Sequence, residues 1–127
     1  QDSPCYNNLI EDIKSFFEER IRYATQFGIQ KNRIILDPGI GFGKSYEDNF
    51  RLINQLEKFN GFKLPILIGP SRKSFIGIAL NEEPESRLEG TLAAVAAGIL
   101  RGAKIVRVHD VKQIRKVAKI IDLIRVA

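Results

Sequence analysis

Residues 33–45 read Arg33-Ile-Ile-Leu-Asp-Pro-Gly-Ile-Gly-Phe-Gly-Lys-Ser45, an apolar run that ends in a glycine-rich loop. The β-branched residues of this run are typical of a buried strand, and Pro38-Gly39 is typical of the point where a strand enters a loop. The same order of an apolar run and a polar stretch returns twice downstream. Strands are therefore predicted over residues 33–37, 65–69 and 104–109.

Helical patterns precede, separate and follow these strands. Apolar side chains recur every three to four residues over residues 9–27, 45–59 and 110–124, and the alanine-rich residues 88–101 also favour a helix. The predicted boundaries are N-caps at Asn8 with Glu11, at Ser45 and at Asp110 with Gln113, and stops at Gly28 and Asn60-Gly61. Strands that alternate with such helices pair in parallel, so the sequence predicts an α/β fold with residues 1–127 as one unit.

Three parallel strands are expected to form an incomplete sheet. Parallel strands are normally covered on both faces, and the outer two strands here would expose unpaired edges. The chain also begins with a helix rather than a strand. We therefore expect it to be part of a larger domain.

Composition excludes several classes of function. The net charge of +5 comes from 20 Lys and Arg against 15 Asp and Glu, and the two signs are mixed along the chain, so nucleic acid is not an expected partner. One cysteine, Cys5, and one histidine give neither an internal disulfide nor the ligand spacing of a zinc site. No apolar run approaches the ~20 residues of a membrane span and no leader pattern is present, so a cytoplasmic location without membrane contact is expected.

The loop after the first predicted strand can approach a ligand closely because glycines stand at positions 39, 41 and 43. It is not a Walker A loop, which would need glycine at Pro38, and it is not a dinucleotide fingerprint, which would need glycine at Lys44. Asp37 at the strand end has two open interpretations. It could accept hydrogen bonds from an amino-pyrimidine edge, or it could bind amides of its own loop.

The other two strands also end in polar loops. Pro70-Ser-Arg-Lys-Ser-Phe75 carries two cations and two hydroxyls, which favours anion or substrate binding over a solvated turn. Arg107 and His109 are two residues apart, so on a strand they would share one face and could meet one anion, although a strand with one polar face is the alternative. Because ligands of α/β folds bind at the carboxyl ends of strands, Asp37, Lys73 and these two residues predict a site for a polar heterocycle that carries phosphate.

These motifs, in this order, resemble those of the dihydropteroate synthase family. The stretches that carry the resemblance are Asp37–Lys44, Ser71–Phe75, Gly90–Ala94 and Arg107–Asp110. The resemblance implies a (β/α)₈ TIM barrel, of which this chain would be the C-terminal portion with strands six to eight and helices five to eight. A complete barrel takes about 250 residues.

The resemblance also implies a reaction and residue roles. A transferase of folate biosynthesis would join 6-hydroxymethyl-7,8-dihydropterin pyrophosphate to p-aminobenzoate and release pyrophosphate. Lys73, Arg107 and His109 would be catalytic, and Asp37 and Lys73 would bind the pterin. Arg107 would stack on that ring and hold the pyrophosphate with His109, while Gly41, Phe42 and Ser74 would border the p-aminobenzoate pocket.

A magnesium ion is implied as well, with its ligand outside this chain, and a homodimer through the late helices. Because the early strands of the barrel have no counterpart here, little or no activity is expected from the chain alone. The alternatives are a pterin-binding methyltransferase domain, which Ser71–Phe75 disfavours, a phosphate-binding NTPase and a non-catalytic dimerising fragment.

Overall fold

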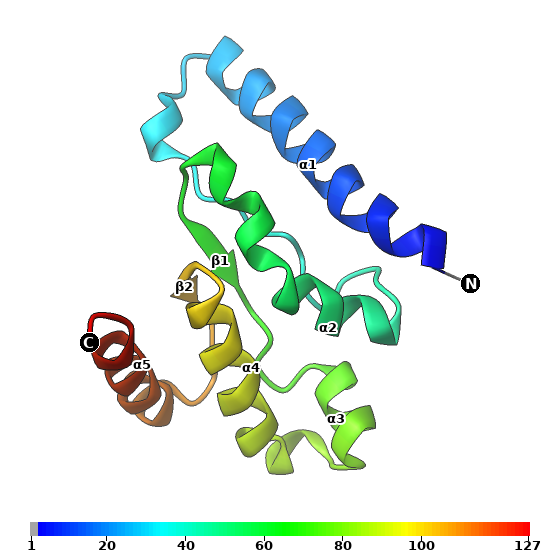
Figure 1. Cartoon of the computed structure of the whole chain (residues 1–127), viewed down its shortest axis with the longest axis vertical. Coiled ribbons are helices and arrows are strands. Elements are labelled where there is room, and N and C mark those ends of the chain that lie inside the picture. Colours follow the sequence, from blue (N-terminus) through cyan, green and yellow to red (C-terminus); the bar gives the residue numbers. More distant parts are fainter. Residues whose placement is uncertain (1–2) are drawn as a thin grey trace.

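The computed structural model describes residues 3–127, with side chains from Asn8 onward, so the side chain of Cys5 lies outside the described part. Five α-helices and two strands are present in this part. In chain order they are α1 (Ser3–Gln26), α2 (Tyr46–Asn54), β1 (Ile66–Ile68), α3 (Ser74–Leu80), α4 (Leu88–Leu100), β2 (Ala103–Val106) and α5 (Val111–Arg125). Short 3₁₀ helices cover Lys31–Arg33, Leu56–Phe62 and Pro84–Ser86. Neighbouring helices lie side by side: α1 contacts α2, α2 contacts α4, and α4 contacts α5 and also packs against β2 (Figure 1).

The α/β class and the parallel pairing are confirmed. β1 and β2 are parallel, with Ile66 opposite Ala103 and Ile68 opposite Val106. The predicted strand over residues 33–37 is reduced to one parallel bridge between Leu36 and Ile66. Leu36 N donates to Pro65 O at 2.9 Å and Leu67 N donates to Leu36 O at 2.8 Å.

Prolines explain where this parallel ladder stops. The next bond after Leu36 would need a donor at residue 38, which is Pro38 and has no N–H. β2 ends at Val106, so the predicted strand over 104–109 is wrong beyond that residue. Arg107 N still donates to Ile68 O at 2.9 Å, but the following donor would be Pro70. Each loop therefore begins where the ladder loses a donor.

Helix boundaries agree with some of the predicted caps. Ser45 Oγ accepts from Asp48 N at 3.2 Å at the start of α2. Gly28, at φ +92°, ends α1 with bonds from Gly28 N to Thr25 O and from Ile29 N to Ala24 O, both 3.1 Å. Asn8 is not a cap, because α1 already begins at Ser3. Asp110 stands at the N-cap of α5 without a capping bond; its Oδ1 accepts from Arg72, and its Oδ2 has no hydrogen-bond partner among the described residues.

Two further boundaries differ from the sequence prediction. α2 ends at Asn54 and continues as the 3₁₀ helix Leu56–Phe62, which closes at Lys63 with φ +58° rather than at Asn60-Gly61. The stretch after Phe75 is not a polar loop, because it contains α3. Seven residues give too short a window for helical periodicity to be recognised.

The hydrophobic core packs side chains of the helices against those of the strands. Phe59, Leu52 and Leu56 are 0% exposed and pack with Phe17 of α1 against the strand residues. The Phe17 ring meets the Phe59 ring edge-on, with centroids 5.4 Å apart. A second apolar cluster of Val95, Ile99 and Ile114 joins α4 to α5. Within the described residues, no helix combines the length and the apolar character needed to cross a membrane.

Phe59→Ala should lower the free energy of unfolding by about 3–5 kcal/mol, because it empties a fully buried ring position. Urea unfolding followed by far-UV circular dichroism measures this loss. Phe27→Ala is the control, since that ring is 72% exposed. Equal losses from the two variants would contradict the position of the core.

Candidate functional site at the carboxyl ends of the strands

The loops that follow Leu36, β1 and β2 leave the sheet at the same edge, because the three segments run in parallel. Asp37 begins the first loop, Lys73 closes the second and Arg107 begins the third. The backbone thus brings together polar residues that are far apart in the sequence.

Asp37 connects the first loop to the third. Its Oδ1 accepts from Gly39 N at 2.9 Å, and its Oδ2 lies 3.6 Å from Nη1 of Arg107. Of the two interpretations left open by the sequence, binding of the loop's own amide accounts for one oxygen. The ion pair is more than one-third exposed on both sides, so it contributes less than about 1 kcal/mol and a ligand can displace it at little cost.

Lys73 lies across the glycine loop. Its Nζ is 3.8 Å from the centroid of the Phe42 ring, a cation–π contact. A Cβ at Gly41 would lie 2.9 Å from Cδ of Lys73, and Gly41 has φ +87°. Glycine at this position therefore gives Lys73 its path over the backbone.

The ammonium group of Lys73 has an altered affinity for its proton. Burial lowers the pKa of Lys73, the positive charge of Arg107 lowers it further, and Asp37 partly opposes both effects. Lys44, on the first loop, also has a lowered pKa, because burial outweighs the attraction of Asp37 and Asp48. Its Nζ donates to Phe42 O at 2.9 Å.

Arg107 crosses the second loop at Gly69. A Cβ at Gly69 would lie 2.8 Å from Nη2 of Arg107, so the guanidinium occupies the space that a larger residue would fill. Since β2 ends at Val106, the spacing of Arg107 and His109 no longer places them on one strand face. Arg107 meets Asp37, whereas Nδ1 of His109 lies 2.7 Å from Ser71 Oγ.

The structure thus joins most of the predicted site residues in two contact sets. Asp37 meets Arg107, and Lys73 meets Gly41 and Phe42. The charges of Arg107 and Asp37 also act on the Lys73 ammonium group. His109 is held separately by Ser71. Ser74 opens α3 with an exposed side chain.

Two supporting residues were missed by the sequence interpretation. Asn49 of α2 is 4% exposed, and its Oδ1 accepts from Gly41 N at 2.7 Å while its Nδ2 donates to Ser45 O at 3.0 Å. Asn49 shares the buried face of α2 with Leu52 and Ile53, and a polar residue on an apolar stripe is a usable signal. Ser71, 5% exposed, is the second residue, and only its place in the polar loop pointed to it.

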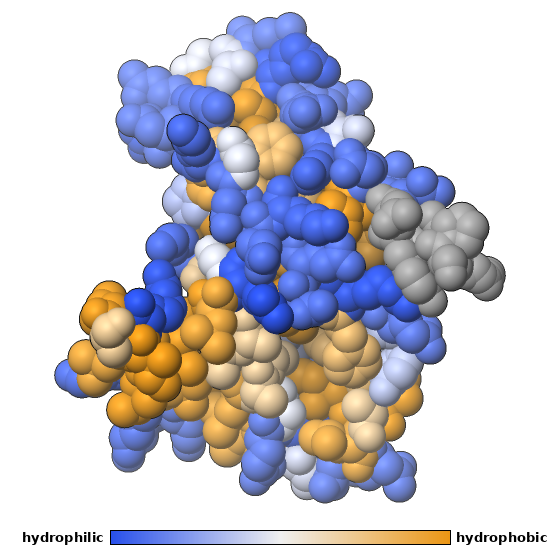
Figure 2. Space-filling view, viewed as in Figure 1, coloured by the Kyte–Doolittle hydropathy of each residue, from blue (hydrophilic) through white to orange (hydrophobic). Residues whose placement is uncertain are grey.

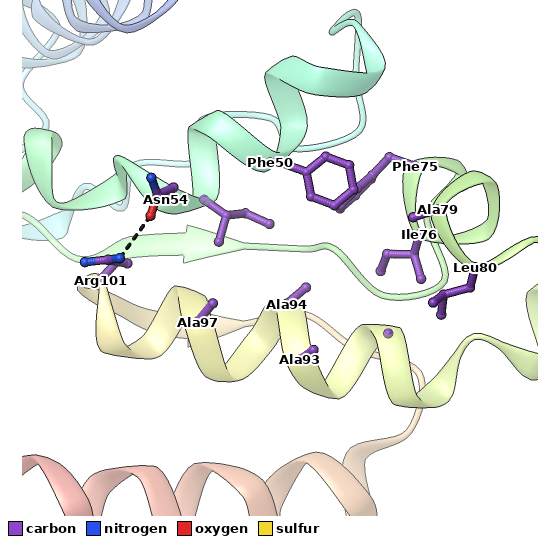
Figure 3. A pocket seen from close by; sticks show the side chains of 12 residues that line it. Phe50, Asn54, Phe75, Ile76, Ala79, Leu80, Ala93, Ala94, Ala97 and Arg101 are labelled. Carbon is purple, nitrogen blue, oxygen red and sulfur yellow. Dashed lines mark hydrogen bonds between the residues drawn. The ribbon is translucent and has the colours of Figure 1, made fainter.

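A separate apolar pocket of about 370 Å³ lies between α2, α3 and α4 (Figure 3). Phe50 and Phe75 form one wall with their rings 5.2 Å apart, and small residues of α4 form another. Arg101 donates to Asn54 Oδ1 at 2.9 Å at one end. The pocket contains none of the residues predicted to act on a ligand, so its lining does not define the chemistry.

The described residues do not fit a metal centre. No group of three or more His, Cys, Asp or Glu side chains gathers among the described residues. Asp37 is bound to Gly39 N and Arg107, and Asp110 Oδ1 is bound to Arg72, while the buried Asp110 Oδ2 has no hydrogen-bond partner in the described part of the chain. That oxygen belongs to a carboxylate already paired with a cation, so this part of the protein supplies no ligand set for the implied magnesium.

A hydrogen-bond acceptor beside cations, at the end of parallel strands, defines an α/β ligand-binding protein whose site suits a polar anionic molecule. The family profile described as "Pterin binding enzyme" matches residues 1–109, and the chain belongs to this family.

Relatives and solved structures agree with that family. The chain is 50% identical over 117 residues to a dihydropteroate synthase of Bacillus subtilis. This alignment covers 92% of this chain and 41% of the relative. It is 41% identical over 122 residues to the Escherichia coli dihydropteroate synthase, covering 96% of the chain and 43% of the relative. The Yersinia pestis dihydropteroate synthase in complex with a sulfonamide drug superposes with a TM-score of 0.93 at 41% identity, covering 96% of this chain and 44% of that one.

A Coxiella burnetii dihydropteroate synthase in complex with pteroic acid gives a TM-score of 0.93 at 41% identity, with 96% of this chain and 46% of that chain covered. This chain therefore spans less than half the length of the curated relatives described here.

Gly41→Ala and Gly43→Ala should distinguish two effects of a new Cβ atom: strain in the backbone, and a collision with the side chain of Lys73. Both glycines have positive φ, so each substitution should lower the free energy of unfolding by about 1–2 kcal/mol. Only a Cβ at Gly41 meets Lys73, while nothing lies within 4 Å of one at Gly43. Gly41→Ala alone should remove the ring-current shift that Phe42 imposes on the Lys73 side-chain protons in NMR spectra. Loss of that shift in Gly43→Ala would contradict the assigned contact.

Neighbouring charges should move the pKa of Lys73 in opposite directions. Arg107→Gln removes a positive charge that disfavours the protonated amine, so the pKa of Lys73 should rise. Asp37→Asn removes a negative charge that favours it, so the pKa should fall. The ¹³Cε shift of Lys73, followed against pH, measures both changes.

Arg101→Gln is the control, since Arg101 pairs with Glu57 and is not among the charges that act on Lys73. A shift of the same sign in Arg107→Gln and Asp37→Asn would show that these charges do not act on Lys73 as described.

Proposed function

We propose that the chain is the C-terminal portion of a dihydropteroate synthase of folate biosynthesis. The observation that carries the proposal is the Asp37–Arg107 pair, with Lys73 within reach of both charges, at the carboxyl ends of parallel strands in a member of the pterin binding enzyme family. The relatives, which are dihydropteroate synthases, support the synthase over a methyltransferase domain.

The proposed substrates are 6-hydroxymethyl-7,8-dihydropterin pyrophosphate and p-aminobenzoate. The bond between the pterin methylene carbon and the pyrophosphate oxygen breaks, and the oxygen keeps the electron pair. The arylamine nitrogen then bonds to the methylene carbon and releases a proton, which gives 7,8-dihydropteroate. Negative charge on the leaving oxygen increases as the bond breaks, so cations placed there stabilise the transition state more than the ground state.

The proposed site residues bind two parts of the pterin substrate, its ring and its pyrophosphate. Asp37 offers carboxylate oxygens to the amino-pyrimidine edge, and Lys73 donates to the same ring. Arg107 stacks on the ring and, with His109, holds the pyrophosphate. Displacement of the weak Asp37–Arg107 pair by substrate would free both side chains for these roles.

The p-aminobenzoate pocket is proposed beside the glycine loop. Gly41 and Phe42 border it from the first loop, and Ser74 from the start of α3. The exposed ring of Phe42 supplies an apolar face for the benzene ring, and Gly41 keeps the backbone close. Lys73, which contacts Phe42 and is acted on by the charge of Arg107, would join the two substrate positions.

We also propose that the complete domain is a TIM barrel, to which residues 1–127 contribute strands six to eight and helices five to eight. The coverage of less than half of each relative supports this. Half a barrel leaves the substrate open to water, so we expect little activity from the chain alone. Magnesium stays a prediction from the resemblance, and a cytoplasmic location stays a prediction from the composition.

A homodimer through the late helices is part of the proposal. Apolar side chains gather over α5 and the neighbouring end of the molecule (Figure 2). Leu100, Ile120, Leu123 and Ile124 are each between 55% and 58% exposed. Burial of such residues against a second copy would remove apolar surface from water.

Arg107→Ala should lower the kcat for pyrophosphate release by about 10²-fold in the full-length protein that carries this chain, because it removes a cation from the leaving group. Pyrophosphate release is measured with magnesium, in the presence and absence of p-aminobenzoate. Arg101→Ala is the matched control, as it removes an exposed arginine that pairs with Glu57. Unchanged turnover and pterin affinity in Arg107→Ala would refute the assigned site, and no p-aminobenzoate-dependent release by the unaltered protein would refute the function.

A further inference from the structure

Ser71 makes two hydrogen bonds to one residue of the next loop. Its Oγ lies 2.7 Å from Nδ1 of His109 and accepts from the backbone N–H of His109 at 3.1 Å. Ser71 is 5% exposed, whereas the side chain of His109 is exposed. The ring is thus held by Nδ1 on its buried side, while Nε2 has no partner within the described part of the chain.

The hydrogen bonds open to the Ser71 hydroxyl favour one protonated form of His109. A hydroxyl has one proton to donate and two lone pairs that accept, and one lone pair already accepts from His109 N–H. A proton on Nδ1 would donate to the second lone pair, and the hydroxyl proton of this buried residue would then have no partner among the described residues. A bare Nδ1 accepts the hydroxyl proton instead, which satisfies both groups when the proton of the neutral ring is on Nε2.

We infer that Ser71 is a positioning residue that keeps His109 in the Nε2–H tautomer and so presents a neutral N–H donor to the leaving group. The inference rests on the proposed function, in which His109 binds the pyrophosphate. The donor forms a hydrogen bond to an oxygen that gains negative charge as the carbon–oxygen bond breaks, and no proton needs to be transferred. In the opposite tautomer, a bare Nε2 lone pair would face the same oxygen and repel it.

A simple structural link between the two loops does not account for this arrangement. Arg72 already joins the same loops, with Nη2 3.1 Å from Asp110 Oδ1. Thr91 Oγ1 accepts from Arg72 N at 3.0 Å, and Arg87 Nη1 donates to Arg72 O at 2.9 Å, so this turn is fixed on α4 without Ser71. Ser71 adds to this link a bond from the backbone N–H of His109 and, unlike Arg72, a contact with the histidine ring.

The tautomer can be observed directly by ¹⁵N NMR of histidine-labelled protein at about pH 8, where imidazole is normally neutral. The chain has one histidine, and loss of the signal in His109→Gln assigns it in the full-length protein. We expect Nε2 to show the shift of a protonated nitrogen and Nδ1 that of a bare, hydrogen-bonded one. Ser71→Ala should shift the ring towards a mixture of the two tautomers. A ring proton on Nδ1 in the unaltered protein would overturn the inference.

Steady-state kinetics of Ser71 variants distinguish a role in positioning His109 from a role in stabilising the fold. Ser71→Ala should lower the kcat for pyrophosphate release by about tenfold while the KM for the pterin substrate changes little, since the donor matters most as charge develops. Ser71→Thr, which keeps the hydroxyl, should restore most of the kcat. Arg72→Gln, which breaks the other link between the loops, should leave the tautomer unchanged.

The outcomes separate the two proposals. An unaltered kcat in Ser71→Ala, or a tautomer change in Arg72→Gln equal to that in Ser71→Ala, would overturn the positioning role. Pyrophosphate release together with an Nδ1 proton would refute the inference and leave the synthase function standing. The expected tautomer without any release would refute the synthase function, and with it the leaving-group role of His109.

Discussion

The parallel alignment of the chain around Ile66–Ile68 is the constraint on which the candidate site depends. Leu36 pairs on one side of β1 and β2 on the other, so three loops leave the sheet at one edge. Pro38 and Pro70 end the pairing at that edge because neither can donate the next ladder bond. The backbone freed at these points forms the loops that contain Asp37, Lys73 and Arg107.

Two glycines allow the charged side chains to lie close to the loops at this edge. Gly41 and Gly69 lack the Cβ atoms that would collide with Lys73 and Arg107, so both long side chains cross the backbone of a neighbouring loop. Asn49 holds the amide of Gly41 from the buried face of α2. The core formed by α1 and α2 thereby determines the position of the glycine loop as well as that of the strands.

The sequence predicted the α/β class, the parallel pairing and the chemical character of the loops, because these follow from local composition and strand order. It could not predict that the first strand is a single bridge, since strand length depends on which donors a neighbour can use. It also placed Arg107 and His109 on one strand face, whereas β2 ends before both. The pairing of Asp110 with Arg72 was missed as well, because no local pattern indicates a partner 38 residues away.

Burial and charge together give a physical reason for the free site to favour an anion. Burial lowers the pKa of Lys73 most, the positive charge of Arg107 lowers it further, and the negative charge of Asp37 opposes both. An anionic group bound beside Arg107 would supply the missing negative charge and stabilise protonated Lys73. By linkage, a ligand that raises the pKa of Lys73 binds more tightly to the protonated form. A pyrophosphate ester would therefore strengthen the positive charge of the site that receives it.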